Sequence, residues 1–315
     1  MVSETAEGLV LRAGSSFCTL VTETGEVLVA SLTKKLRQGG RTHTTSAVIG
    51  DRVIMRRSPG RTSDGVVDSV SGRHNELYRL APGRRTIKDV LAANLDSLLV
   101  VHSLRLPDFT AARLDRFLAI AEQAEIPAAV VLNKADLAPA DEADAIADAY
   151  RQSGYPVIIS SAKTCAGIDE IQSRLSGISA LIGPSGVGKS TILNQILPDL
   201  ALRTAEVNDY TGKGKHTTVA SELLPLGHGA YVADTPGMRS IALTGLDRYE
   251  VASVFRELRP LIGSCRFPDC LHLQEPGCAV KAAVADGGFS AERYDSYQKL
   301  LEHVIDGYVE DWEAG

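Results

Sequence analysis

Short apolar segments separated by turns fill about the first 75 residues of the chain. Leu9 with Leu11, and Val27 with Val29, show the period-two spacing of half-buried strands. Five or so strands of this kind predict a small β-barrel of the OB-fold type, an architecture that often binds nucleic acid. A barrel with no ligand fits the same pattern. The segments are GLVLR (8–12), FCTLVT (17–22), EVLVASL (26–32), GDRVIMR (50–56) and GVVDSV (65–70).

Beyond about residue 88, apolar strand segments alternate with helical stretches. The run SLLVV (97–101) is nearly continuous, as expected of a strand that is buried on both faces. Leu114, Phe117, Leu118 and Ala121 follow it with the spacing of an amphipathic helix. The alternation predicts an α/β domain around a largely parallel sheet. Further strand segments are AAVVL (128–132), PVIIS (156–160), ISALIG (178–183) and AYVAD (230–234).

The pattern changes again after about residue 245, where it becomes helical and includes a cluster of cysteines with a histidine. We therefore predict a multidomain protein. Its parts are an OB-fold barrel (1–78), a central α/β P-loop domain (88–245) and a mostly helical metal-binding domain (246–315).

The composition, with 44% hydrophobic and 23% charged residues, is ordinary for a soluble globular protein. No apolar run approaches the roughly 18 residues of a membrane-spanning helix, so no membrane partner is expected. The opening MVSETAEG has neither the basic nor the apolar region of a secretory signal. A cytoplasmic protein is expected, in which the five cysteines suggest a metal site or inert thiols rather than disulfides.

Charge is distributed unevenly along the chain. Residues 1–88 hold 14 Lys and Arg against 8 Asp and Glu, and the remainder holds 19 against 31, so balances of +6 and −12 sum to the net −6. A basic amino-terminal part on an acidic protein suits a polyanionic partner such as RNA. A solvated basic face without a partner explains the same balance.

The segment that begins at Gly183, GPSGVGKS, fits the phosphate-binding pattern GxxxxGK[ST] between an apolar strand and a helical stretch. In this pattern, backbone N–H groups wrap the phosphates, and the helix N-terminus adds a favourable dipole. Lys189 is predicted to reach the β- and γ-phosphates, and the Ser190 hydroxyl to bind Mg²⁺. A purely structural glycine loop explains this context less well. The predicted nucleotide contacts are Gly183, Pro184, Ser185, Gly186, Val187, Gly188, Lys189, Ser190 and Thr191.

The four residues Asn133, Lys134, Ala135 and Asp136 follow the strand 128–132 and match the NKxD element of GTPases. A carboxylate at Asp136 accepts the N1–H and N2–H₂ hydrogens of guanine, a donor pair that adenine lacks. Lys134 is expected to cover the base plane, and Asn133 to tie the loop to neighbouring backbone. A capped helix start explains these four residues alone about as well. Their place after a strand, in a chain with a P-loop, favours GTP.

Two shorter elements extend the predicted nucleotide site. Ser161, Ala162 and Lys163 resemble the SAK element, whose backbone N–H meets guanine O6, although three residues alone mean little. The segment DTPG (234–237) matches DxxG, in which Asp234 holds Mg²⁺ through water and the Gly237 amide senses the γ-phosphate. An ordinary turn is the alternative for DTPG.

The segment GKGKHTT (212–218) is glycine-rich and lies between the P-loop helix and DTPG. A GTPase places its first switch there, with a threonine that binds Mg²⁺. The sequence does not choose between Thr217 and Thr218. The elements run NKxD, SAK, P-loop, switch and DxxG, which is a circular permutation of the usual GTPase order. Because the termini of compact domains often lie close together, such a permutation preserves the sheet.

The carboxy-terminal cluster comprises Cys265, Cys270, His272 and Cys278. Three thiolates and an imidazole within 14 positions suit one tetrahedral Zn²⁺. The site is expected to be structural, since four protein ligands leave no open position.

Together, these motifs resemble the ribosome small subunit-dependent GTPase A family over nearly the whole chain. GDRV (50–53), AANLD (92–96) and GKHTT (214–218) carry the resemblance together with NKAD, GPSGVGKST, DTPG and the Cys/His cluster. The resemblance implies a GTPase that binds the small ribosomal subunit during late maturation. It also implies hydrolysis stimulated by that subunit, release afterwards, and rRNA contact by the barrel. GTP or GDP with Mg²⁺, one Zn²⁺, no DNA partner and a monomer are expected.

Met238 follows DTPG where many GTPases carry a glutamine that orients the attacking water. The family's switch histidine corresponds to His216, which can orient or deprotonate this water. A solvated loop histidine is the alternative. Lys189, His216 and Thr217 or Thr218 are therefore the catalytic candidates.

Two other functions fit parts of the pattern. One is an RNA-binding module in which GTP only sets the affinity, and the other is a P-loop kinase or ATPase.

Overall fold

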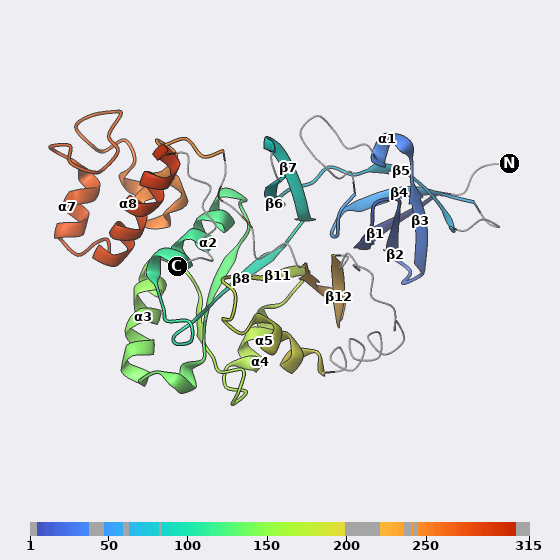
Figure 1. Ribbon diagram of the computed structural model, residues 1–315, viewed down its shortest axis with the longest axis horizontal. Coiled ribbons are helices and arrows are strands. Elements are labelled where there is room, and N and C mark those ends of the chain that lie inside the picture. The colour runs from blue at the N-terminus through green and yellow to red at the C-terminus, as the bar shows by residue number, and fades with distance from the viewer. Residues whose placement is uncertain are drawn as a thin grey trace. The chain divides into compact units, whose positions relative to one another are not determined.

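The computed structural model describes residues 5–37, 47–58, 63–81, 84–198, 221–235, 241, 243 and 245–306. Two compact units make up the chain (Figure 1). The first unit comprises Met1–Ser97, Leu175–Leu181 and Leu200–Ala242. The second comprises Leu98–Arg174, Ile182–Asp199 and Leu243–Gly315. None of the described helices has both the length and the apolar composition needed to cross a membrane.

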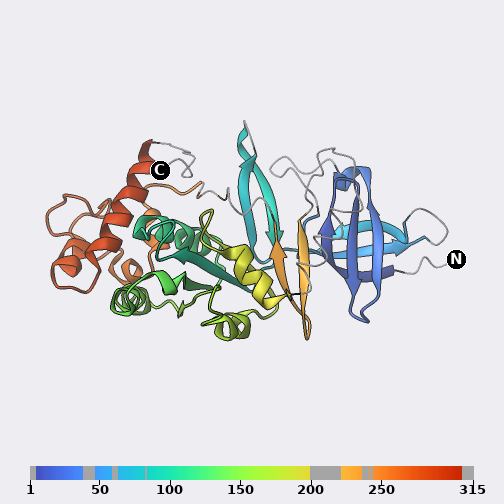
Figure 2. The same ribbon diagram turned by 60° about the horizontal axis from the view of Figure 1, so that its bottom comes forward.

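A closed β-barrel lies at the start of the first unit (Figure 2). Strands β1, β2 and β3 form an antiparallel meander, β3 pairs in parallel with β5, and β4 pairs with both β5 and β1 to close the barrel. The bounds are β1 (Thr5–Ala13), β2 (Phe17–Thr22), β3 (Val27–Leu32), the short helix α1 (Lys34–Arg37), β4 (Arg52–Arg57) and β5 (Gly65–Val70). The predicted barrel is confirmed.

The barrel interior shows which phase of the strand alternation is buried. Leu28 and Ala30 of β3 lie in the core, whereas the alternate residues Val27 and Val29 are 60% and 39% exposed. The predicted period of two is therefore present, but the second apolar set faces outward. When a strand is apolar on both faces, its sequence does not reveal which face points into the barrel interior.

Among the residues that the structure describes, the rest of the first unit contains three more strands and a separate hairpin. Strand β13 runs parallel to β11 and antiparallel to β12, and β12 meets β1 at the pair Arg12–Glu222. The sequence patterns did not predict β12 or the hairpin. The bounds are β6 (Glu76–Ala81), β7 (Arg84–Ala93), β11 (Ile178–Ile182), β12 (Glu222–Gly227) and β13 (Ala230–Asp234).

The motifs GDRV and AANLD meet at a tight junction beside the barrel. Asn94 adopts a left-handed backbone (φ 56°), and its Nδ2 donates to the Gly50 carbonyl at 2.9 Å. A Cβ at Gly50 would lie 2.0 Å from the Ala93 oxygen, so only glycine fits. The buried Asp51 accepts two hydrogen bonds from Arg73, at 2.7 and 2.8 Å. These two motifs therefore serve the architecture.

The second unit contains the predicted parallel strands. Strand β9 lies between β8 and β10 and is parallel to both, and all six of its residues are buried. The predicted apolar stripe of α2, which includes Leu114 and Leu118, is also buried. The bounds are β8 (Ser97–Ser103), α2 (Ala111–Gln123), β9 (Ala128–Asn133), η1 (Ala135–Leu137), α3 (Ala140–Gln152), β10 (Val157–Ile159), α4 (Ile168–Arg174) and α5 (Lys189–Ile196).

The carboxy-terminal region is helical, as predicted. Its apolar core contains Phe255, Leu258, Tyr297 and Leu301 and includes Ala119 of α2, so α8 packs against the α/β part of the same unit (Figure 1). The bounds are η3 (Val251–Val254), η4 (Arg256–Leu261), α7 (Ala279–Ala285) and α8 (Ala291–Asp306).

A buried ion cluster holds this region to α2. The Arg293 side chain of α8 is 2% exposed and contacts the equally buried Asp115 of α2. Arg293 also donates to Glu257 of η4, with 3.0 Å between Nη2 and Oε2. The rings of Tyr150 and Phe255 lie 5.2 and 5.4 Å from the guanidinium. A charge so deeply buried depends on its partners, because removing one leaves the others uncompensated in a low-dielectric interior.

Replacement of Arg293 by Met is expected to lower the free energy of unfolding by about 3–5 kcal/mol, because two carboxylates lose their cation. The exposed pair Arg151–Asp148 offers a matched control, and Arg151→Met should cost under about 1 kcal/mol. Urea unfolding of the three proteins measures both changes. Equal effects of the two substitutions would contradict a structural role for the buried cluster.

Candidate functional site

The glycine-rich loop 183–188 connects β11 to α5 and is shaped by two close approaches. Gly183 has φ 142°, and a Cβ there would lie 2.1 Å from the Val101 oxygen. Gly188 has φ 98°, and a Cβ there would lie 2.3 Å from Nδ2 of Asn133. Val187 is fully buried and anchors the loop between them. The glycines are thus required by packing as well as by backbone conformation.

Lys189 begins α5, and its ammonium folds back over the loop. Nζ donates to the carbonyl oxygens of Gly183 and Pro184, at 2.7 and 2.6 Å. The first turn of α5 carries backbone N–H groups without intrahelical partners, which suit an anion. Ser190 and Thr191 lie exposed in that turn, and Ser185 and Gly186 are exposed in the loop. The arrangement is that of a phosphate cradle.

Asn133 ends β9, is 1% exposed, and joins the loops of two other motifs. Its Nδ2 donates to the Val187 carbonyl at 2.8 Å. Its Oδ1 accepts from the Ala162 backbone N–H at 3.1 Å and from the Ser160 hydroxyl at 3.4 Å. One side chain therefore fixes the P-loop against the segment 161–163.

Lys134 has a left-handed backbone (φ 60°), and Ala135 then begins η1. The Lys134 ammonium donates to the Gly186 carbonyl at 2.7 Å and also to the carbonyl of Leu106. Lys134 thus binds the P-loop from the same side as Asn133. The contact with Leu106 brings in the segment after β8, which the sequence motifs did not indicate.

Asp136 faces a cavity of about 280 Å³ beside the P-loop. Its Oδ1 accepts from the Ser161 hydroxyl at 2.7 Å, and its Oδ2 lies 3.8 Å from Nζ of Lys163. The carboxylate is held in place at the cavity wall. The lining residues are Asn133, Lys134, Asp136, Leu137, Ser161, Ala162, Lys163, Gly188 and Thr191.

Asp234 is the last residue of β13, in the first unit. Ala233 lies opposite Ala180 of β11, so Asp234 marks the carboxyl end of a strand whose parallel neighbour continues into the P-loop. The predicted residues His216, Thr217, Thr218 and Gly237 lie outside the described residues.

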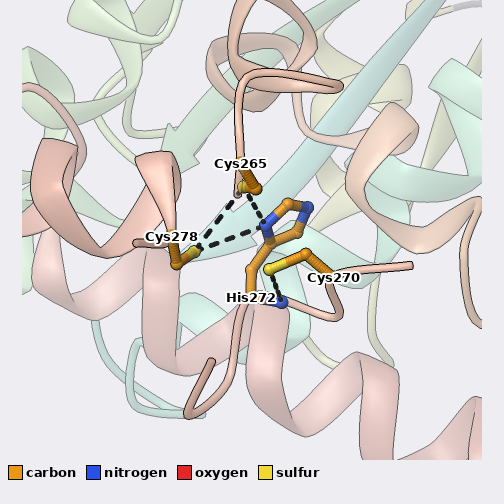
Figure 3. A group of neighbouring side chains, drawn as sticks. All are labelled: Cys265, Cys270, His272 and Cys278. Carbon is orange, nitrogen blue, oxygen red and sulfur yellow. Dashed lines mark hydrogen bonds between the residues drawn. The ribbon is translucent and has the colours of Figure 1, made fainter. Parts of the chain in front are cut away.

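The side chains of Cys265, Cys270, His272 and Cys278 converge on one point (Figure 3). The Sγ atoms of Cys265 and Cys278 are 3.9 Å apart, and Nδ1 of His272 lies 3.4 and 3.5 Å from them. Tetrahedral Zn²⁺, with bonds of about 2.3 Å to sulfur and 2.0–2.1 Å to nitrogen, requires edges of about 3.8 Å and 3.6 Å. The four donors therefore fit the ion in chemistry and in spacing.

The loop around these donors is stabilised independently of them. The Glu275 carboxylate accepts from the backbone N–H groups of Leu271, Leu273 and Gln274, at 2.8–3.0 Å. Burial acts to raise the pKa of Glu275, but these N–H donors outweigh it and hold the pKa below its ordinary value. The Tyr294 hydroxyl of α8 donates to the His272 carbonyl at 2.6 Å. The donors are thus prearranged by the fold.

The model for the family described as RsgA GTPase matches residues 70–244, more than half of the chain. The chain belongs to the RsgA GTPase family. It is therefore a GTPase, and the resemblance found in its motifs is confirmed.

Curated relatives in this family are similar over almost their full length. The small ribosomal subunit biogenesis GTPase RsgA of Gemmatimonas aurantiaca is 41% identical over 302 residues, which cover 95% of this chain and 97% of the relative. The protein of the same name from Moorella thermoacetica is 41% identical over 300 residues, with the same coverage of both chains.

Two solved structures share the fold of this RsgA GTPase family member. YjeQ from Thermotoga maritima has a TM-score of 0.76 at 32% identity, over 96% of this chain and 99% of YjeQ. YloQ, described as a circularly permuted GTPase, has a TM-score of 0.75 at 30% identity, over 98% of this chain and 97% of YloQ. The predicted fold class, with its barrel, permuted GTPase domain and helical carboxy-terminal part, is confirmed.

Zinc content provides a direct test of the Cys/His cluster. Purified protein is expected to carry about one Zn²⁺ per chain, and Cys278→Ser should lose the ion and lower the melting temperature, because a ligand is missing. Cys165 is exposed and lies outside the cluster, so Cys165→Ser should keep the metal. Atomic emission on the three proteins measures this, and equal zinc in both variants would reject the site.

Proposed function

We propose that this GTPase acts in late maturation of the small ribosomal subunit. It binds the subunit in its GTP state and leaves after hydrolysis that the subunit stimulates. The main support for a guanine site is the pair of contacts made by Asn133. Its side chain joins the P-loop to the segment 161–163, which lines the cavity together with Asp136. The small ribosomal subunit named for the curated relatives supports the partner.

In this proposal the cavity beside the P-loop takes the guanine base. Asp136 accepts the N1–H and N2–H₂ hydrogens, and Ser161 holds its carboxylate in position. A backbone N–H of segment 161–163 meets O6. Ala135 belongs to the same base-binding loop, which Lys134 and Asn133 fix to the P-loop.

The phosphates lie in the cradle formed by residues 183–191. Lys189 neutralises charge on the β- and γ-phosphates, and the Gly237 amide meets the γ-phosphate. Ser190 and either Thr217 or Thr218 would supply oxygen ligands of the kind that Mg²⁺ prefers, and Asp234 would hold the ion through water. Bound Mg²⁺ offsets the negative charge of the phosphates. His216 orients the attacking water or takes its proton.

The surface proposed to bind the ribosomal subunit is inferred from the charge of the amino-terminal part and from its barrel. The +6 balance of residues 1–88 favours rRNA contact through the barrel, within the proposed division 1–78, 88–245 and 246–315. We propose a cytoplasmic monomer with one structural Zn²⁺ and no DNA partner.

Base recognition is tested by Asp136→Asn. The amide cannot accept both guanine hydrogens, so GTP affinity should fall about 10- to 100-fold, while xanthosine triphosphate, whose C2 oxygen accepts from the amide, should gain. Asp169→Asn, an exposed position on α4, is the matched control. Equilibrium titration with GTP, XTP and ATP gives the comparison. If the parent protein binds ATP as tightly as GTP, the result would favour the P-loop kinase or ATPase and would contradict the proposed guanine site.

Coupling to the subunit is tested by GTP hydrolysis with and without purified small ribosomal subunits. The small subunit should stimulate turnover, whereas large subunits should not, and ATP should not be hydrolysed. His216→Ala should lower stimulated turnover by about 100-fold or more while sparing GTP binding, because the water loses its base.

If the small subunit does not stimulate hydrolysis although the protein still binds GTP, the proposed action on the ribosome is contradicted. If His216→Ala blocks hydrolysis yet does not trap the protein on the subunit, GTP only sets the affinity, as in the RNA-binding module.

A further inference from the structure

Gln195 lies on α5, six positions after the P-loop lysine, and belongs to none of the nucleotide motifs. Its Nε2 donates to the carbonyl oxygen of Ala162 at 3.1 Å. Its Oε1 accepts from the thiol of Cys165 at 3.5 Å. Only the NH₂ end of an amide can donate to a carbonyl, so these two contacts agree on one orientation of the side chain.

The backbone of Ala162 is consequently held from two sides. Its N–H donates to Oδ1 of Asn133 on β9, at 3.1 Å, and its carbonyl accepts from Gln195 on α5. In a trans peptide the carbonyl and the following N–H point in opposite directions. Fixing the Ala162 carbonyl therefore also fixes the direction of the Lys163 N–H.

Helix α5 also supplies a residue to the wall of the cavity beside the P-loop. Thr191, one helical turn before Gln195, lines the cavity together with Ala162 and Lys163. The helix thus begins at the phosphate cradle and, nearly two turns later, holds Ala162, which lines the same cavity.

We propose that Gln195 is a positioning residue for guanine specificity. The proposal rests on the guanine site proposed above: by holding the Ala162 carbonyl, the Gln195 amide orients the N–H of Lys163 toward O6 of the base. Asp136 reads the N1–H and N2–H₂ edge from η1, whereas the hydrogen bonds of Gln195 go to Ala162 and Cys165. Loss of the Gln195 amide therefore weakens recognition of O6 and leaves recognition of the other edge in place.

The test compares Gln195→Ala with Asn194→Ala, an exposed neighbour on the same helix at which alanine also raises helix propensity. Each protein is titrated at equilibrium with GDP, inosine diphosphate and 6-thio-GDP, and the parent also with ADP. Inosine lacks only the N2 amino group, and 6-thioguanine replaces only O6, by a sulfur that accepts weakly.

In Gln195→Ala, the affinity for GDP should fall about three- to tenfold, the usual effect of one hydrogen bond. The preference for GDP over 6-thio-GDP should fall by a similar factor, and the preference for GDP over inosine diphosphate should stay unchanged. Asn194→Ala should match the parent throughout. Gln195→Glu keeps the acceptor for Cys165 but loses the donor, and should reproduce the selective loss.

Parent-like affinities in Gln195→Ala would overturn the inference, and so would an equal loss for all three nucleotides, which indicates a general loosening of the loop. Since Gln195 is exposed, the variants should melt with the parent. A parent without preference for GDP over ADP would instead overturn the guanine site itself. A guanine-selective parent whose Gln195→Ala variant keeps the affinities of the parent would overturn only the role of Gln195.

Discussion

The hydrogen bonds of Asn133 hold together the candidate nucleotide site. One buried amide donates to the P-loop and accepts from the segment 161–163, so two loops that are distant in sequence share a single anchor. Gly188 can approach this anchor only because it lacks a Cβ. A buried amide that loses one partner costs about 1–3 kcal/mol. The loops around the cavity therefore stay in register with each other, and Lys134 reinforces the same link from the next position.

The carboxy-terminal region combines an apolar core with buried charge and a cluster of potential metal ligands. Arg293 connects α8 and η4 to α2, and the Cys/His donors organise the loop before α7. Both features lie in the same compact unit as the loops of Asn133 and Asp136. Helix α2 is therefore one of the elements that join the carboxy-terminal region to the α/β part of this unit.

Much of the fold was predictable because local patterns carry it. The parallel strands were visible as apolar runs, and α2 as an amphipathic stripe, since both periodicities report burial directly. The hairpin β6–β7 was missed because its strands carry several charged residues, including Arg79 and Lys88. The buried face of β3 was also undetermined, because apolar residues occupy both phases and closure of the barrel decides between them.

The amino-acid sequence alone carried the chemical features of this protein: a P-loop, the carboxylate that we propose reads guanine, a Cys₃His donor set and their permuted order. These features are encoded as short motifs, because adjacent residues must present their groups to one ligand. The tertiary structure alone decided how the motifs are joined, through Asn133 to Val187, Lys134 to Leu106, Gln195 to Ala162 and Arg293 to Asp115. Each of these contacts spans more than 25 residues of chain, and no local pattern encodes which distant backbone group a buried side chain will meet.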